Sequence, residues 1–124
     1  MDTTGHKIIL AITGASGSVY AKNLLTKLTN LKHPPAEIAV IFSDNAKEIW
    51  EYEIGRKYKA KAPVREFNNS SFFAPFASGS TDYDTMIVCP ASMGIIGRIA
   101  CGTSENLIAR AADVMLKERR KLLF

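Results

Sequence analysis

Residues 7–20, KIILAITGASGSVY, decide the fold that we expect for this chain. They open with an apolar run at 8–12 that is short, rich in β-branched residues and free of charge, as is typical of a strand buried on both faces. Two glycines in the following turn let the backbone approach a ligand closely. Ser16 or Ser18 is expected to cap the next helix and leave free N–H groups directed at an anion. The stretch therefore predicts a strand, a small-residue turn and a helix that hold a phosphate.

The glycine spacing distinguishes between classes of nucleotide site. Gly14 and Gly17 are three residues apart, and Val19 stands where the third glycine of a dinucleotide-binding turn would be. The motif therefore favours a mononucleotide or a simple phosphate over NAD. Because short glycine motifs often occur by chance, a tight connection without a ligand stays open as the alternative.

Composition indicates a single domain of an ordinary soluble protein. The chain has 124 residues, of which 47% are hydrophobic and 23% charged. The net charge is +4, and four basic residues crowd into 117–121, which favours a local phosphate site over nucleic-acid binding. Cys89 and Cys101 have no metal-ligand spacing, so we expect free thiols in a reducing cytoplasm and no metal. No apolar segment reaches the ~18 residues that a membrane span needs.

Two further strand-to-helix turns follow along the chain. Residues 37–42, EIAVIF, form an expected strand that ends at Ser43-Asp44-Asn45, and residues 85–89, TMIVC, form another that ends in PASMG. Strand, helix and strand in succession predict a parallel pair. The three turns are then expected at the carboxyl edge of one sheet, where open α/β folds bind ligands.

Apolar residues recur at helical spacing in four segments, which we expect to cover the sheet: 18–31, 46–54, 95–100 and 107–116. Residues 121–124 look like a fourth strand that is just starting. The fold class expected is α/β, with a parallel sheet and a single domain over residues 1–124. Because the sheet looks unfinished, we expect the C-terminal part to be missing and the chain to be the N-terminal two thirds of a longer one.

Residues 55–83 are expected to form a long connection with little periodicity. The first part is basic, and the second part contains Phe72, Phe73 and Phe76 among small polar residues. Three aromatic residues are more than a solvated loop needs. They either cover the core or form an apolar wall over a ligand.

Blocks of sequence along nearly the whole chain resemble one family. The blocks are TGASG at 13–17, Ser43, AP at 74–75, ASGS at 77–80, CPASMG at 89–94, NL at 106–107, RAADV at 110–114 and LKERR at 116–120. In this order they strongly resemble the flavin prenyltransferases of the UbiX type, and the last block is the most specific.

The resemblance implies a three-layer, flavodoxin-like or Rossmann-like parallel sheet, with one flavin-binding domain over residues 1–124. It implies a homododecamer that joins a dimethylallyl group to reduced FMN. It implies dimethylallyl monophosphate as the donor and no metal. The product, prenylated FMN, is the cofactor of a UbiD-type decarboxylase in ubiquinone synthesis or aromatic acid decarboxylation.

The resemblance also assigns roles to individual residues. Ser16, Glu53 and Lys117 match catalytic positions, with Ser16 near the prenyl phosphate and Lys117 binding it. Phe72 falls where the family often has an aromatic wall for the prenyl group. Because pockets of this family form between subunits, Lys117 is expected to serve a neighbour's site. The flavin contacts implied are Gly14, Ala15, Ser16, Ser43, Ser92, Met93, Gly94 and Ile95.

Some positions depart from the family pattern. Ala91 stands where a cysteine is common, Lys121 replaces a proline, and the family's C-terminal arginine–glutamate pair, tyrosine and arginine would lie beyond Phe124.

Two rival functions stay open for this sequence. One is a flavin-dependent decarboxylase of a cysteine peptide or a phosphopantothenoylcysteine-type substrate, which relies on an early histidine. His6 and His33 do not stand at the start of the first helix. The other rival is a flavin-binding protein without catalysis.

Overall fold

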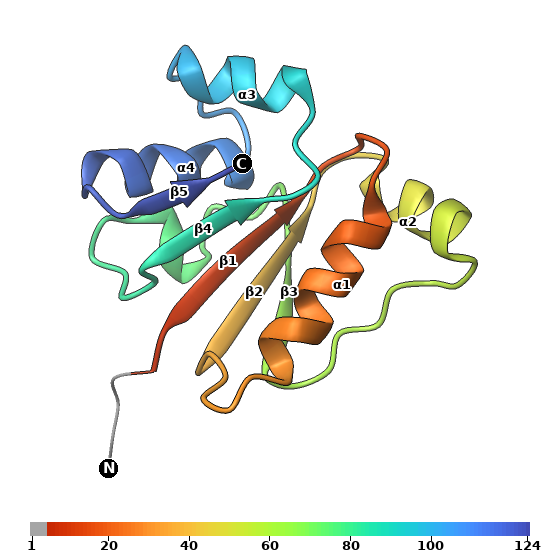
Figure 1. Ribbon diagram of the computed structural model, residues 1–124. Helices are drawn as coiled ribbons and strands as arrows, with labels where there is room; N and C mark the ends of the chain where they lie inside the picture. Colours follow the sequence, from red (N-terminus) through yellow and green to blue (C-terminus); the bar gives the residue numbers. More distant parts are fainter. Residues whose placement is uncertain (1–4) are drawn as a thin grey trace.

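The expected strand–turn–helix units are present in the computed structural model, which describes residues 5–124 (Figure 1). The sheet strands are β1 Lys7–Ile12, β2 Glu37–Phe42, β3 Val64–Asn68, β4 Thr85–Val88 and β5 Lys121–Leu123. The helices are α1 Ser18–Thr29, α2 Ala46–Ile54, α3 Met93–Ala100 and α4 Leu107–Lys117, with a 3₁₀ turn, η1, at Pro75–Ala77. The first helix ends two residues earlier than its apolar pattern predicted.

The five strands form one sheet in the order β3-β2-β1-β4-β5, and every pairing is parallel. β1 lies in the middle, where Leu10 pairs with Val40 on one side and with Ile87 on the other. Because all strands point the same way, the turns that follow β1, β2 and β4 meet at one edge (Figure 1). The predicted three-layer parallel fold is confirmed.

Alternate residues of β1 pack against different helices. Leu10 and Ile12 share a core cluster with residues of α1 and α2, such as Ala21 and Trp50. Ile9 and Ala11 belong to the cluster that includes α3 and α4. The uniform apolar run is thereby explained, since both faces of the strand are covered and no position faces water. Among the described residues, 5–124, no helix is long and apolar enough to cross a bilayer.

One strand was missed by the sequence analysis. Residues 55–83 were expected to form an irregular connection, but Val64–Asn68 forms the edge strand β3, paired with β2 from Ile38↔Val64 to Phe42↔Asn68. Its side chains alternate poorly because Arg65 and Glu66 are exposed. Charged residues are common on edge strands, where they discourage pairing with other chains, and they hide the apolar signal.

The three phenylalanines of the following loop have different environments. Phe76, in η1, is fully buried and packs edge-to-face against Phe67 and Tyr83, with ring centroids 5.1 Å apart in each pair. Phe73 is 100% exposed, and Phe72 is 45% exposed. Of the two roles proposed for the loop aromatics, covering the core applies to Phe76.

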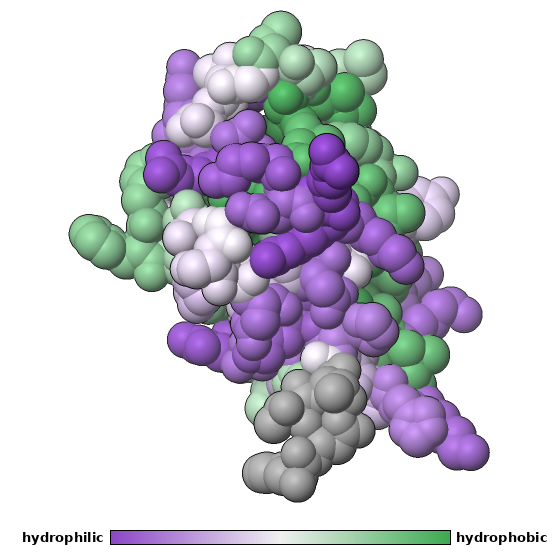
Figure 2. Space-filling model, turned by 90° about the vertical axis from the view of Figure 1, so that its left-hand side faces the viewer, coloured by the Kyte–Doolittle hydropathy of each residue, from purple (hydrophilic) through white to green (hydrophobic). Residues whose placement is uncertain are grey.

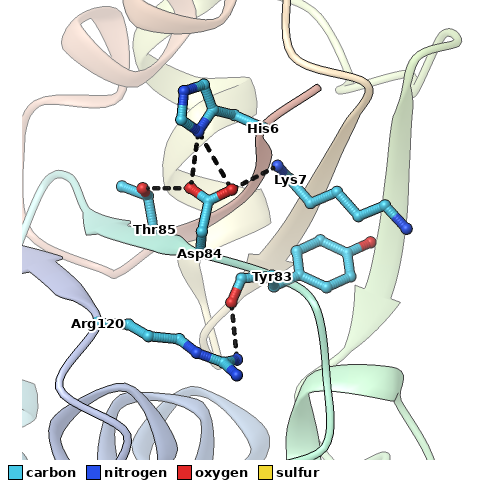
Figure 3. A network of polar contacts seen from close by, with 6 residues as sticks. All are labelled: His6, Lys7, Tyr83, Asp84, Thr85 and Arg120. Atoms are coloured by element: carbon cyan, nitrogen blue, oxygen red, sulfur yellow. Dashed lines mark hydrogen bonds and ion pairs between the residues drawn. The ribbon is translucent and has the colours of Figure 1, made fainter. Parts of the chain in front are cut away.

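A polar network joins the amino ends of β1 and β4, at the edge of the sheet away from the three turns (Figure 3). The Asp84 carboxylate accepts hydrogen bonds from the Lys7 backbone N–H at 3.2 Å and from the Thr85 hydroxyl at 2.7 Å, and His6 Nδ1 lies 3.2 Å from both of its oxygens. Arg120 Nη1 donates to the Tyr83 carbonyl at 2.9 Å. These contacts fix the start of β4 beside β1 and β5.

Replacing Phe76 by alanine is expected to lower the free energy of unfolding by about 3–5 kcal/mol, because the change leaves a cavity between two aromatic rings. Phe73→Ala is the matched control from the same loop and is expected to change it by less than about 0.5 kcal/mol. Urea denaturation of both variants measures the difference. Equal losses would contradict the packing described for η1.

Candidate functional site

A hollow of about 460 Å³ opens at the carboxyl edge of the sheet. Gly14 comes from the turn after β1, Ser43 from the turn after β2, and Ser92 from the turn after β4. The three small-residue turns therefore line one cavity, within the size range of small-molecule sites. The full lining is Thr13, Gly14, Ser43, Asp44, Asn69, Ser92, Ile95, Arg98, Glu105 and Asn106.

The side chain of Thr13 joins two of these turns. Its hydroxyl donates to the Pro90 carbonyl at 2.5 Å and accepts from the Ser92 backbone N–H at 2.9 Å. Thr13 is only 1% exposed, so neither bond is replaced easily by water. The Ser92 hydroxyl in turn accepts from the Ile95 N–H and caps α3. The first and third turns are thus held in a fixed relation.

The N-terminus of α1 is closed by Glu53, which projects from the end of α2. One carboxylate oxygen accepts from the Ser18 and Gly17 N–H groups at 3.0 and 3.2 Å, and the other accepts from the Ser16 hydroxyl at 2.7 Å. The predicted cap was wrong, because neither Ser16 nor Ser18 forms a side-chain cap and Gly17 is the capping residue. The N–H groups expected to be free for an anion bind the chain's own carboxylate.

This arrangement lowers the pKa of Glu53 from its ordinary value of 4.5 to about 2. The N–H of Ser18 has the largest effect, followed by the Ser16 hydroxyl and the Gly17 N–H, because each stabilises the charged form. Glu53 is therefore an anion near neutral pH. It can accept a proton only after these hydrogen bonds are weakened.

Lys117 lies in a different hollow, of about 280 Å³, between α4 and the loop at 77–79. Arg110 lines the same hollow, donates from Nε to the Ala77 carbonyl at 3.2 Å, and places its guanidinium 5.9 Å from the centre of the Phe72 ring. Lys117, Arg110 and Phe72 thus belong to one region. Figure 2 shows the side of the molecule with α4 and β5, where hydrophilic residues form a broad band.

The structure brings together only part of the predicted site. Gly14, Ser43, Ser92 and Ile95 line the hollow at the carboxyl edge. Met93 and Gly94 begin α3 beside it, and Ala15 lies in the first turn, but these three do not line it. Ser16 is held by Glu53 outside both hollows, and Lys117 is in the other one. The predicted catalytic residues do not meet in one pocket of the described chain.

Several residues that shape the site were not predicted. Asn69 contacts the start of α4, where its backbone carbonyl accepts from the Leu107 N–H at 2.8 Å and its side-chain oxygen accepts from the Ile108 N–H at 3.0 Å. Asn106 caps the same helix, and Arg98 adds a cation to the lining. The asparagine before the apolar stripe of α4 was a recognisable capping signal. Asn69 had none, because its loop looked irregular.

The described residues, 5–124, contain no group of three histidine, cysteine or acidic side chains that is placed to hold a metal ion. Within that range Cys89 and Cys101 are free cysteines, and burial raises the pKa of the Cys89 thiol.

The sequence profile of the family described as "Flavoprotein" matches residues 1–124, so the chain belongs to this family. It is 45% identical over 119 residues to a flavin prenyltransferase UbiX of Methanocaldococcus jannaschii. The aligned region covers 94% of this chain and 62% of that protein. The chain thus spans less than two thirds of the length of this relative.

Solved structures have the same fold. AnUbiX (PadA1), described as a complex with FMN and dimethylallyl pyrophosphate, matches with a TM-score of 0.84 and 36% identity, over 95% of this chain and 62% of that one. A dodecameric FMN-dependent UbiX-like decarboxylase from Escherichia coli O157:H7 matches with a TM-score of 0.81 and 36% identity, over 94% and 64% of the two chains.

Replacing Thr13 by valine keeps the shape of the side chain but removes both hydroxyl bonds. We expect a loss of about 1–3 kcal/mol in the free energy of unfolding, because the Ser92 N–H is left without its acceptor. Hydrogen exchange of the Ser92 backbone N–H is expected to accelerate by more than the fall in the global free energy of unfolding accounts for. Thr13→Ser keeps the hydroxyl and is expected to restore slow exchange; unchanged exchange in the valine variant would contradict the link.

The Glu53 contacts predict a defined dependence of stability on pH. Because the folded pKa of about 2 lies below the ordinary 4.5, the contribution of Glu53 is complete above pH 4.5 and is lost as the pH falls toward 2. Glu53→Gln is expected to flatten this part of the profile of urea midpoints. Glu51→Gln, an exposed neighbour on α2, is the matched control and is expected to leave the profile unchanged.

Proposed function

We propose that this chain is the flavin-binding part of a flavin prenyltransferase, which transfers a dimethylallyl group from dimethylallyl monophosphate to reduced FMN. The observation that carries the proposal is the meeting of Gly14, Ser43 and Ser92 around one hollow at the carboxyl edge of a parallel sheet. Open α/β folds bind their ligands at this edge. The names of the prenyltransferase relatives and the solved complex with FMN and a prenyl diphosphate support the same conclusion.

The chemistry of the hollow fits a flavin. Ser43, Ser92 and Asn69 offer neutral hydrogen-bonding groups for the ring, and Arg98 offers a cation for a phosphate. Gly14 lies close to the second turn and to α2, since a Cβ there would be 3.8 Å from the Asp44 carbonyl and 3.4 Å from Ile49 Cδ1, both ordinary contact distances. In our proposal reduced FMN supplies the nucleophile.

In the proposed reaction, the bond between the allylic carbon and the phosphate oxygen breaks, and the prenyl carbon bonds to the reduced flavin. Negative charge develops on the departing phosphate, where Lys117 and the Ser16 hydroxyl stabilise it. Positive charge develops on the prenyl group, where the face of Phe72 stabilises it. These roles are proposals for the residues concerned.

Glu53 is proposed to move protons as the flavin is alkylated and a new ring closes. Its low pKa makes it a weak base while it is bound to α1. Binding of a phosphate near Ser16 would compete for the same N–H groups and would release the carboxylate. In this proposal Glu53 has two states. It is a weak base while its carboxylate is bound to the start of α1, and a stronger base once a phosphate has displaced it.

We also propose that the complete site forms between subunits of a homo-oligomer. Lys117 and Ser16 belong to different regions of one chain, so a neighbour's Lys117 is the better candidate for the phosphate at Ser16. The dodecameric relative supports a homododecamer. The product would serve a UbiD-type decarboxylase in the cytoplasm, in ubiquinone synthesis or aromatic acid decarboxylation.

The test is to incubate the chain with reduced FMN and dimethylallyl monophosphate and to record a mass spectrum of the extracted flavin. A gain of one C5 unit is expected, and the Lys117→Ala variant is expected to retain FMN but form at least tenfold less product, since one charged contact contributes about that much. Bound but unchanged flavin would mean a flavin-binding protein without this activity. Unchanged flavin together with decarboxylation of a cysteine peptide would support the decarboxylase alternative.

A further inference from the structure

The positive charge of the chain comes from two segments that are far apart in the sequence. Residues 18–36 contain three lysines and no acidic residue, and residues 55–63 contain four basic residues and no acidic one. The nine basic residues elsewhere are outnumbered by the twelve acidic residues of the chain. The positive net charge of +4 therefore comes from these two segments, and the rest of the chain is slightly acidic. The seven basic residues are Lys22, Lys27, Lys32, Arg56, Lys57, Lys59 and Lys61.

The fold places these two segments side by side. The segment that follows α2 runs along α1 (Figure 1), and a hollow of about 640 Å³ lies between them, lined by Lys22, Arg56, Lys57 and Lys59. A second hollow of about 370 Å³ continues it toward Asn30 and also contains Lys59. We call the two together the basic groove. It extends along α1 from Lys22 to Asn30, about 12 Å at the rise of an α-helix.

The basic groove combines an apolar lining with exposed cations. Leu25, Ile54 and Tyr58 are half-buried in it, whereas the lysines and Arg56 are exposed. Among residues 5–124, none of the seven cations forms an ion pair. Glu66, the carboxylate that helps to raise the pKa of Tyr58, is already paired with Lys47. The basic residues that line the groove are thus free of ion pairs within the described chain.

We propose that the basic groove binds an acidic, partly apolar segment of a partner protein, with apolar side chains against Leu25, Ile54 and Tyr58 and carboxylates against the surrounding lysines. Charge complementarity decides the class of partner, because five basic residues line the groove and, among residues 5–124, none of them forms an ion pair. The inference does not depend on the proposed enzymatic activity, since the groove and the candidate site have no lining residue in common.

Other anionic partners fit the groove less well. Nucleic-acid sites of this kind offer several aromatic faces for stacking, whereas the aromatic residues that line the groove are the half-buried Tyr58 and the buried Trp50. A lipid bilayer is flat, whereas the apolar residues lie in a concave surface. A second copy placed symmetrically on this face would bring like charges together.

The test uses a fluorescent peptide of about twelve residues, long enough to cover the groove as a helix, with leucines at every third or fourth position and glutamates between them. Fluorescence anisotropy is expected to show binding that weakens with salt. The double variant Lys57→Glu, Lys59→Glu is expected to bind at least about tenfold more weakly. Arg119→Glu with Lys121→Glu has the same charge change outside the groove and is expected to bind almost as the parent chain does.

Two control peptides test the two parts of the proposal. One replaces leucine by glutamine, and the other replaces glutamate by glutamine; both are expected to bind much more weakly. Circular dichroism and FMN binding check the fold of the variants, and Lys22→Gln with Lys57→Gln is a milder substitute if the first pair does not fold.

Several results would overturn the proposal. The leucine-free peptide could bind as tightly as the original peptide, or the Arg119→Glu, Lys121→Glu control could weaken binding as much as the groove variant does. A DNA oligonucleotide or phosphatidylserine vesicles could also bind more tightly than the peptide. A change of oligomeric state in the groove variant alone would assign this face to a second copy instead. A parent chain that binds the peptide but does not bind FMN would contradict the proposed function and leave the proposal for the basic groove in place.

Discussion

The position of β1 in the middle of a parallel sheet is the constraint on which the other features depend. Its apolar residues need cover on each face, and consecutive parallel strands need a crossover connection, usually a helix. In this sheet every strand points the same way, and helices cover both faces of β1. The turns after β1, β2 and β4 must then share an edge. Thr13, the first residue after β1, joins two of those turns through one hydroxyl.

The carboxylate of Glu53 changes how this edge can treat an anion. The turn after β1 has the composition of a phosphate site, yet two N–H groups and a hydroxyl there are already bound to a negative side chain. An incoming phosphate at this turn has to compete with Glu53 for those donors. Positive groups nearby are Arg98 in the hollow and Arg110 with Lys117 in the neighbouring one. An anion bound at this turn would therefore be coupled to the protonation state of Glu53.

Different surfaces of the domain have different physical roles. The carboxyl edge has the hollow and the exposed ends of helices, whereas polar contacts around Asp84 lock the amino edge. The side formed by α1 and residues 55–63 contains the basic groove and concentrates the positive charge.

The sequence predicted four of the five strands and all four α-helices, because apolar periodicity and small-residue turns are local signals. It did not predict β3, since Arg65 and Glu66 conceal an edge strand whose stability comes from pairing with β2. The sequence also did not predict which loop aromatic residue is buried. Phe72, Phe73 and Phe76 have similar sequence surroundings, and packing alone distinguishes the buried Phe76 from the two exposed residues.

For the candidate site, the sequence by itself determined which turns would line the edge, because strand direction and turn composition are encoded locally. Only the tertiary structure decided that the Glu53 carboxylate binds the N–H groups at the start of α1. Ser16 and Glu53 are 37 residues apart and meet because α2 packs beside α1. The same reason applies to the basic groove, which two separate segments form together. Local residues specify elements and corners, whereas contacts between distant side chains depend on how those elements pack.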